Sequence, residues 1–210
     1  DVFQEMIPFK SISILSGPSF SNEVSQNLPT ALTLATKDKK DFDNISKLIP
    51  NKEFRIYYSN DLIGTQIGGA LKNIYAIAAG IAEGLNLGEN AKSALISRSF
   101  AEMTRYAKKF KADKNTLFGL SGLGDLILTC SSKNSRNTQF GIKLASSKYD
   151  NFLDLLKSQE VTEGYYTVKA VYNISQKKNI DMPIMESVYN ILYKQHDLKE
   201  ELSNLLSRPI

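Results

Sequence analysis

Residues 62–82, LIGTQIGGALKNIYAIAAGIA, are the stretch that decides the fold of this chain. Apolar residues such as Ile67, Leu71 and Ile74 recur there at steps of three and four, a spacing that predicts a helix. Glycine and alanine fill most of the other faces, so we expect a helix that is buried nearly all round and closely approached by its neighbours. The stretch also contains Lys72 and several glycines, and for this reason we reject a membrane span.

Lys72 is the only charged residue between Asp61 and Glu83. Glycine, tyrosine and alanine stand three and four positions away, so no carboxylate on the same helix can pair with this lysine. A buried ammonium without a partner costs on the order of several kcal/mol, so it must find a partner elsewhere or lose its proton. Either outcome suits a catalytic lysine. The alternative is that the side chain reaches the surface along its aliphatic stem.

Residues 116–132, TLFGLSGLGDLILTCSS, show the same pattern with the opposite sign, because Asp125 is their only charge. One isolated cation and one isolated anion, each in an apolar run, most simply neutralise each other. We therefore predict that Lys72 and Asp125 approach in the fold and hold a shared polar site. The alternative is that Asp125 caps the helix that follows Gly124.

Residues 131–137, SSKNSRN, bring together two cations, three hydroxyls and two amides. If a helix starts just after them, its first N–H groups add the positive end of the helix dipole, and the cluster predicts an anion site. Arg136 suits a phosphate because its planar guanidinium binds two oxygens at once. The alternative is a solvated loop. Gly17 and Ser19 follow a predicted strand end, where open α/β sheets place ligands, although this signal is weak by itself.

The composition is that of a soluble globular protein, with 42% hydrophobic and 23% charged residues among 210. The net charge of +4 favours anionic partners, and because the basic residues are scattered we give nucleic acid little weight. The single cysteine, Cys130, excludes an internal disulfide, suits a reducing cytosolic compartment, and is interpreted as a core residue. The one histidine, His196, is expected at the surface, and no metal site is expected.

Short apolar and β-branched runs predict three strands, at residues 11–15, 30–36 and 54–59. The intervening residues predict a short helix over 22–26, capped by Ser19 or Ser21, and a helix over 41–48. This order is typical of an open α/β sheet. The chain opens on Asp1 without a secretory leader, which is typical of a polypeptide that begins within a domain.

No convincing strand follows residue 61, and the remainder is expected to be all-helical. Asn90 and Asp197 are the expected caps of two of its helices, and Pro183 suits a first turn. The expected helices cover residues 62–82, 91–110, 137–146, 152–157, 163–177, 183–195 and 198–206.

Five segments in order resemble the bacterial NAD(P)-dependent glycerol-3-phosphate dehydrogenases, namely SGPSFSNEV, LPTALTLAT, GALKNIYAIAAGIAEGLNLGEN, FGLSGLGDLILTCSSKNSRNTQFG and VTEGYYTVKAV. The resemblance implies that residues 1–60 are the last part of a Rossmann-type dinucleotide-binding domain. No G-x-G-x-x-G loop occurs in this chain, so it lacks a dinucleotide fingerprint of its own. Residues 61–210 are implied to form an all-α substrate-binding and catalytic domain of the 6-phosphogluconate dehydrogenase C-terminal-like kind.

The resemblance also implies roles for individual residues. Lys72 is the implied acid and base at the C2 oxygen, supported by Asn73, Asp125 and Thr129. The implied substrate-binding residues are Gly17, Ser19, Lys72, Asp125, Ser135, Arg136 and Asn137. The implied cofactor-binding residues are Ser21, Arg136, Val161 and Glu163, with Ser21 standing where the family usually has alanine.

The implied function is interconversion of sn-glycerol 3-phosphate and dihydroxyacetone phosphate by hydride transfer with NAD or NADP. The resemblance further implies a cytoplasmic enzyme that feeds glycerophospholipid synthesis, with a homodimer as one option. We expect the 210 residues by themselves to be inactive. Two alternatives are left open, another NAD(P)-dependent dehydrogenase of hydroxy or sugar acids and a non-catalytic helical binding module.

Overall fold

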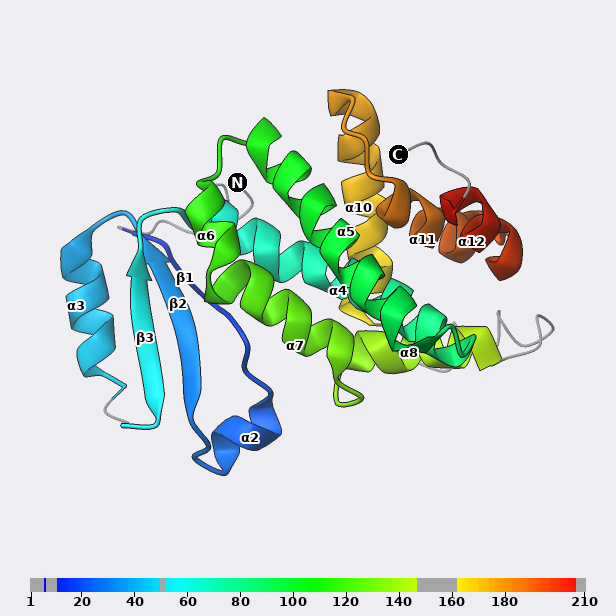
Figure 1. Cartoon of the computed structure of the whole chain (residues 1–210). Coiled ribbons are helices and arrows are strands. Elements are labelled where there is room, and N and C mark those ends of the chain that lie inside the picture. The colour runs from blue at the N-terminus through cyan, green and yellow to red at the C-terminus, as the bar shows by residue number, and fades with distance from the viewer. Residues whose placement is uncertain (1–5, 7–10, 50–51, 147–161, 207–210) are drawn as a thin grey trace.

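The computed structural model describes residues 6, 11–49, 52–146 and 162–206, and it joins a small sheet to a larger set of helices (Figure 1). The expected fold class, an α/β remnant followed by an all-helical part, is confirmed, and the described residues after β3 contain no strand. The elements in chain order are β1 (Ser13–Ser16), α2 (Ser21–Ser25), β2 (Thr30–Thr36), α3 (Lys39–Lys47), β3 (Phe54–Ser59), α4 (Leu62–Gly84), α5 (Gly88–Lys109), α6 (Lys114–Phe118), η1 (Leu120–Gly124), α7 (Asp125–Ser131), α8 (Arg136–Ser146), α10 (Glu163–Lys178), α11 (Pro183–Lys194) and α12 (Leu198–Leu206).

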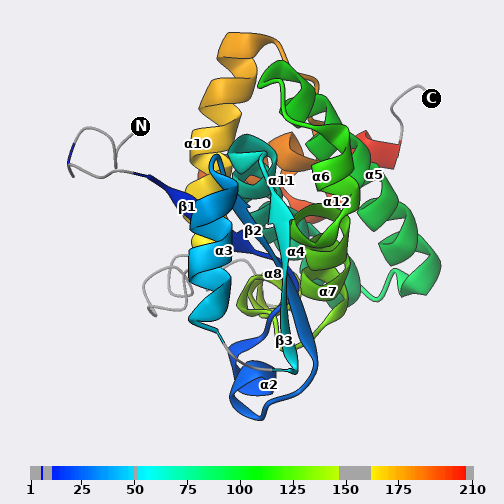
Figure 2. The ribbon, with the colours of Figure 1, turned by 90° about the vertical axis from the view of Figure 1, so that its left-hand side faces the viewer.

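The sheet has three strands in the order β1-β2-β3. β2 pairs antiparallel with β1 and parallel with β3, and the parallel pair is connected through α3, which lies on the side of the sheet away from α4 (Figures 1 and 2). The strands predicted at 30–36 and 54–59 are confirmed, whereas β1 starts two residues later than expected. The helix expected over residues 152–157 lies outside the described residues.

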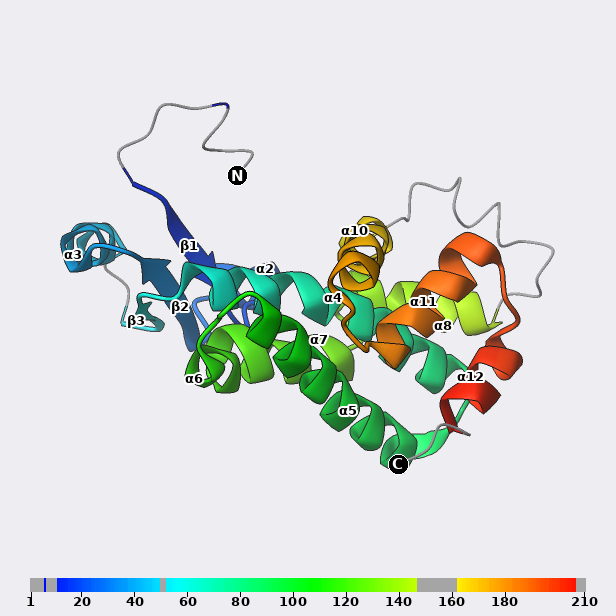
Figure 3. The ribbon, with the colours of Figure 1, turned by 90° about the horizontal axis from the view of Figure 1, so that it is seen from above.

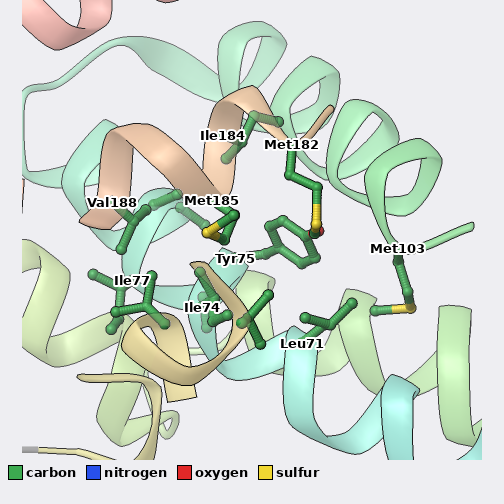
Figure 4. Close-up of a cluster of buried hydrophobic side chains, with 14 of the residues drawn as sticks. Leu71, Ile74, Tyr75, Ile77, Met103, Met182, Ile184, Met185 and Val188 are labelled. Atoms are coloured by element: carbon green, nitrogen blue, oxygen red, sulfur yellow. The ribbon is translucent and has the colours of Figure 1, made fainter. Parts of the chain in front are cut away.

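Helix α4 is the centre of the helical part, with α5, α7, α8, α10 and α11 packed on it (Figure 3). Fifteen of its 23 residues are buried, which confirms the expectation of a helix covered nearly all round. Its Leu71, Ile74 and Tyr75 meet methionine and aliphatic side chains of α5 and α11, among them Met103 and Met185 (Figure 4). None of the described helices has the length and apolar character that a membrane crossing requires.

The start of α2 differs from the sequence expectation. The residue at its N-cap is Phe20, which has no polar side chain to offer, so neither Ser19 nor Ser21 caps the helix. The Ser19 hydroxyl instead donates to the carbonyl oxygen of Gly17, at 3.2 Å. The serine is therefore used to close the turn after β1.

Helix α5 also starts earlier than expected, at Gly88, and its N-cap is Leu87 instead of Asn90. The backbone of Leu87 is already helical (φ −73°, ψ −10°), so the tight reversal after α4 leaves no extended residue to act as a side-chain cap. The other two expectations are confirmed. Pro183 occupies the first turn of α11, and the Asp197 carboxylate accepts hydrogen bonds from the N–H groups at the start of α12.

A buried carboxylate joins three helices behind the core. Glu102 of α5 is 1% exposed and accepts hydrogen bonds from the N–H of Ile184 (2.6 Å) and of Met185 (3.3 Å). The Tyr75 hydroxyl of α4 donates to the same carboxylate, at 3.4 Å. Because Pro183 has no N–H, this carboxylate satisfies the next two donors of the first turn of α11. Glu102 thus holds α11 against α4 and α5.

We predict a pH-dependent contribution of Glu102 to stability. Burial raises the pKa of its carboxyl from 4.5 to about 7, although the two N–H donors and Arg105 act in the opposite direction. The folded protein then keeps a proton that the unfolded chain loses, so stability falls by on the order of 3 kcal/mol as pH rises from the ordinary glutamate pKa to about 7. Urea unfolding of wild type and Glu102→Gln across this window should show a flatter pH dependence in the variant.

The matched control for this experiment is Glu89→Gln, at an exposed position of the same helix. It should leave the pH dependence of the unfolding free energy as it is in the wild type. An identical pH dependence in wild type and Glu102→Gln would contradict the assignment of this titration to Glu102.

Candidate active site

The two isolated charges predicted to meet do so. The Lys72 ammonium donates to the Asp125 carboxylate, with 2.6 Å between Nζ and Oδ2. The aspartate side chain is 2% exposed and the lysine side chain 22%, so the ion pair has a buried anionic end and a cationic end that reaches solvent. Asp125 makes no capping hydrogen bond, because the N-cap of α7 is Gly124, so the interpretation of Asp125 as a cap is wrong.

The register of this ion pair is set one helical turn earlier. Helix α4 has no Cβ at Gly68, and the backbone of η1 lies so close there that an added Cβ would collide with the carbonyl oxygen of Ser121. Gly68 precedes Lys72 by four residues, and Ser121 precedes Asp125 by four. The close approach of the two backbones therefore leads directly to the meeting of the two charges. The π-helical winding of η1 is a local feature that often accompanies functional sites.

Opposing influences act on the ionisation of Asp125. Burial raises the pKa of its carboxyl above the usual range, while Lys72 and the Thr129 hydroxyl lower it. The Thr129 hydroxyl lies 2.6 Å from the backbone carbonyl oxygen of Asp125 and 3.2 Å from Oδ1, and thereby holds the carboxylate in place. Among the residues that the structure describes, Asp125 is the only hydrogen-bond acceptor for Lys72, so the ammonium has donors left for a ligand.

A second polar network connects α4 to the start of α8 and α10. The Asn137 amide donates to Asn73 Oδ1 (3.1 Å), and its own oxygen accepts from the N–H of Gly164 (3.0 Å). The Asn73 amide donates to the Glu163 carboxylate, at 3.2 Å. Both asparagines are 7% exposed. Asn137, which the sequence suggested as a phosphate ligand, thus has both ends of its amide bound to the protein.

The cluster at residues 131–137 leads into helix α8, as the anion-site hypothesis requires, because this helix starts at Arg136. Ser135 is 4% exposed, and its hydroxyl accepts the N–H of Thr138, which makes Ser135 a cap of that helix. The Arg136 side chain is 80% exposed and lies 3.5 Å from the Glu163 carboxylate, a loose contact that leaves the guanidinium available. Lys133, the other cation of the cluster, turns away and pairs with Glu83 at 3.4 Å.

These side chains border one cleft of about 450 Å³. Its lining residues come from the loop after β1, α2, α4, α7 and the start of α8, and they are Ser19, Phe20, Ser21, Asn22, Lys72, Asn73, Asp125, Leu128, Thr129, Asn134, Ser135, Arg136 and Asn137. In Figure 1, α2 and the turn between α7 and α8 both lie at the lower side of the molecule. Segments more than 100 residues apart in sequence therefore share the cleft.

Most of the residues predicted from the sequence line this cleft, and two do not. Gly17 is buried beside β2, where its positive φ of 147° and the nearby Leu32 side chain favour glycine. Glu163 does not line the cleft, but its carboxylate is bound to Asn73 and Arg136, which do. Val161 lies outside the described residues.

Three lining residues were not predicted from the sequence: Phe20, Asn22 and Leu128. Asn134, which also lines the cleft, belongs to the predicted anion cluster at residues 131–137. Leu128 follows Asp125 by one helical turn, a spacing that could have placed it on the same face. Phe20 and Asn22 carry no charge pattern, and only the fold brings the start of α2 to the cleft.

Other features of the described residues do not compete with this cleft. A second cavity, of about 230 Å³ between α4, α5, α11 and α12, has a mostly apolar lining. Cys130 is fully buried, as expected for a core residue, and burial raises its thiol pKa to about 12. The side chain of His196 is 43% exposed and bound to Glu201, as expected near the surface. No group of three or more potential metal ligands occurs among the residues described.

We predict that Gly68→Ala is strongly destabilising and that Gly69→Ala is not. A Cβ at position 68 meets the fixed backbone of η1, and overpacking of this kind costs about 1–3 kcal/mol. A Cβ at position 69 meets only the Ser16 hydroxyl at 3.0 Å, which can rotate, and alanine is the better helix former by about 1 kcal/mol. Urea unfolding of both variants measures the difference, and equal stabilities would contradict the proposed register contact.

Comparison with known proteins gives a consistent result. The family model described as "NAD-dependent glycerol-3-phosphate dehydrogenase C-terminus" matches residues 61–203, and the corresponding N-terminus model matches residues 1–42. A relative from Colwellia psychrerythraea is 44% identical over 94% of this chain and 59% of its own length. One from Francisella tularensis is 41% identical over the whole chain and 63% of its own length. Both are named "Glycerol-3-phosphate dehydrogenase [NAD(P)+]".

A solved structure agrees with these relatives. The glycerol-3-phosphate dehydrogenase of Coxiella burnetii superposes with a TM-score of 0.89 at 38% identity, over 94% of this chain and 61% of that protein. The present chain thus spans about 60% of the length of the relatives it matches.

Proposed function

Because this chain belongs to the NAD-dependent glycerol-3-phosphate dehydrogenase family, we propose that its cleft is the substrate half of an enzyme that interconverts sn-glycerol 3-phosphate and dihydroxyacetone phosphate with NAD or NADP. The observation that carries this proposal is the Lys72–Asp125 pair in a polar cleft whose lining also includes Arg136. A cation that can exchange a proton thus shares one cleft with a cation suited to phosphate.

In this proposal Lys72 moves the proton. Its ammonium protonates the oxygen that forms at C2 when the ketone is reduced, and the neutral amine takes the proton back when the alcohol is oxidised. Asp125 accepts a hydrogen bond from the ammonium and fixes its direction, and the Thr129 hydroxyl holds Asp125 in turn. The 2.6 Å contact between the two charges uses one of the three ammonium donors, so the others are available to the substrate oxygen.

Arg136 and the start of α8 are proposed to bind the phosphate. The guanidinium is exposed and loosely held, so it can move from Glu163 onto a phosphate with two oxygens in reach. The N-terminus of α8, at Arg136 itself, adds the positive end of its dipole beside the guanidinium. Binding energy from the phosphate, which does not react, then holds C2 beside Lys72.

The nicotinamide cofactor fits this chain at one end only. Ser21 and Arg136 line the cleft, and Glu163 is bound to Arg136, so these residues would contact the nicotinamide end, which supplies or accepts the hydride. Val161 belongs to the same proposed set. The 210 residues contain no G-x-G-x-x-G loop for the pyrophosphate, so we propose that they do not turn over substrate by themselves.

Further parts of the proposal rest on the family resemblance and on composition. Residues 1–60 are proposed as part of the dinucleotide-binding domain and residues 61–210 as the substrate domain. A cytoplasmic enzyme suits the single buried thiol, and a role in glycerophospholipid synthesis and a homodimer follow from the resemblance.

The alternatives make different demands on the cleft. A non-catalytic helical module would have no use for a paired Lys72 at a polar cleft, whereas the observed lysine is paired with a buried carboxylate. A dehydrogenase of hydroxy or sugar acids would need no phosphate-binding end. The deciding experiment measures dihydroxyacetone-phosphate-dependent oxidation of NADH and NADPH by this chain, alone and joined to the upstream segment that its relatives carry. Activity only in the joined form supports the proposal, and a folded joined form that is silent with both cofactors contradicts it.

We predict that Lys72→Met in the joined form lowers kcat by about 10²–10⁴-fold, because it removes the proton donor. The variant leaves Asp125 buried without its partner, which by itself weakens the fold. Lys72→Met combined with Asp125→Asn removes both charges and should recover the unfolding temperature but not the activity. Near-normal kcat in either variant would exclude Lys72 as the acid and base.

We predict that Arg136→Ala raises KM for dihydroxyacetone phosphate by about 10–100-fold, the usual range for a lost charge-assisted contact of about 1.5–3 kcal/mol. Turnover of dihydroxyacetone, which lacks the phosphate, should change little. Lys133→Ala is the matched control, because this lysine lies in the same turn but pairs with Glu83 outside the cleft. Equal effects of the two variants on KM would indicate a general loss of positive charge.

A further inference from the structure

We propose that Thr138 is a positioning residue that fixes the separation between the Lys72–Asp125 pair and Arg136. The inference rests on the proposed function, which gives these groups their roles. Thr138 belongs to the first turn of α8, is fully buried, and does not line the cleft. It therefore acts through other groups and does not touch the substrate.

The Thr138 side chain ties α8 to α7. Its hydroxyl donates to the backbone carbonyl oxygen of Thr129, at 2.8 Å. Thr129 lies in the last turn of α7, where a carbonyl oxygen finds no N–H donor within its own helix. One turn earlier in the same helix, Asp125 holds Lys72. The hydroxyl of Thr138 thus connects α8 to the helix that positions the ammonium.

The Thr138 backbone fixes the same turn from two other directions. Its N–H donates to the Ser135 hydroxyl at 3.2 Å, which shapes the turn that carries Arg136. Its carbonyl oxygen lies against α4, where a Cβ added at Gly80 would collide with it. Gly80 follows Lys72 by eight residues, about two helical turns along α4. Thr138 therefore contacts both helices of the ion pair while standing two residues from Arg136.

The separation of Arg136 and Lys72 matters only for a substrate that contacts both residues. A phosphate held by Arg136 places C2 correctly only if the distance from Arg136 to Lys72 is constant, and a misplacement of about 1 Å can cost a hundredfold in rate. A substrate without the phosphate is not held by Arg136, so a change in the distance from Arg136 to Lys72 does not alter its kcat/KM. The two kinds of substrate therefore report separately on positioning and on general stability.

The test compares Thr138→Val with Thr138→Ser in the chain joined to the upstream segment. Valine keeps the shape and removes the hydroxyl, whereas serine keeps the hydroxyl. We expect kcat/KM for dihydroxyacetone phosphate to fall about tenfold or more in Thr138→Val and to stay within about threefold of wild type in Thr138→Ser. For dihydroxyacetone, kcat/KM should be unchanged in both variants.

The matched control is Thr104→Val. The Thr104 hydroxyl also donates to a backbone carbonyl, that of Phe100 at 2.9 Å, but this bond lies within α5 and away from the cleft. Thr104→Val should leave kcat/KM unchanged for both dihydroxyacetone phosphate and dihydroxyacetone. If Thr138→Val does not fold, Thr138→Ala is compared with Thr138→Ser instead, since alanine and serine differ only by the hydroxyl.

The outcomes separate this inference from the proposed function. Loss of kcat/KM for the phosphorylated substrate alone, restored by serine, supports the positioning role. Equal losses for both substrates, or no loss in Thr138→Val or Thr138→Ala, overturn it while the proposed function stands. If the wild-type joined form does not reduce dihydroxyacetone phosphate, the proposed function fails and the inference fails with it.

Discussion

The rest of the structure depends on the meeting of one buried carboxylate and one lysine. Asp125 is almost completely removed from solvent, and without Lys72 its charge would lie unpaired in an apolar segment. The two residues belong to helices that are distant in sequence, so the pair requires α7 to lie at a fixed height along α4. Gly68 permits this by letting the backbone of η1 touch α4 one turn before the charges meet. The ion pair can therefore form because Gly68 has no side chain.

Close backbone contact is a general feature of α4. The same device recurs where α8 crosses this helix, because Gly80 of α4 and Gly141 of α8 each lack room for a Cβ. Helices in such close contact have little freedom to slide, and the residues that they carry keep their distances. Elsewhere in the core, Glu102 holds the first turn of α11 to α4 and α5. Burial raises the pKa of this carboxyl, so it is harder to ionise than an exposed glutamate. The close backbone contacts of α4 hold the helix that carries Lys72 to the cleft, and its Tyr75 contacts the titratable Glu102 in the core.

The two cationic groups of the cleft differ in how firmly they are held. Lys72, Asp125 and Thr129 are linked by hydrogen bonds of 2.6 to 3.2 Å in a mostly buried setting. Arg136, by contrast, is exposed and its contact with Glu163 is long. This difference suits the proposed roles of a preorganised proton-transfer group and an anion-binding group that admits its ligand from solvent. The asparagine network next to Arg136 joins α4, α8 and α10, so the exposed side chain extends from a backbone that this network holds.

The sequence by itself determined the elements with a strong local pattern and the pairing with a strong electrostatic demand. The period of α4, the strands β2 and β3, and the need of Lys72 for a carboxylate all follow from the residues alone, because periodicity and isolated charge are local properties. Only the tertiary structure decided how the polar groups without net charge are used. Asn137 lines the cleft, and its amide is also bound to Asn73 and Gly164, which are 64 and 27 residues away. Phe20 and Leu87 replaced the expected caps, and Thr138 found its acceptor, because an uncharged hydrogen bond is worth too little to choose a partner before the helices have packed.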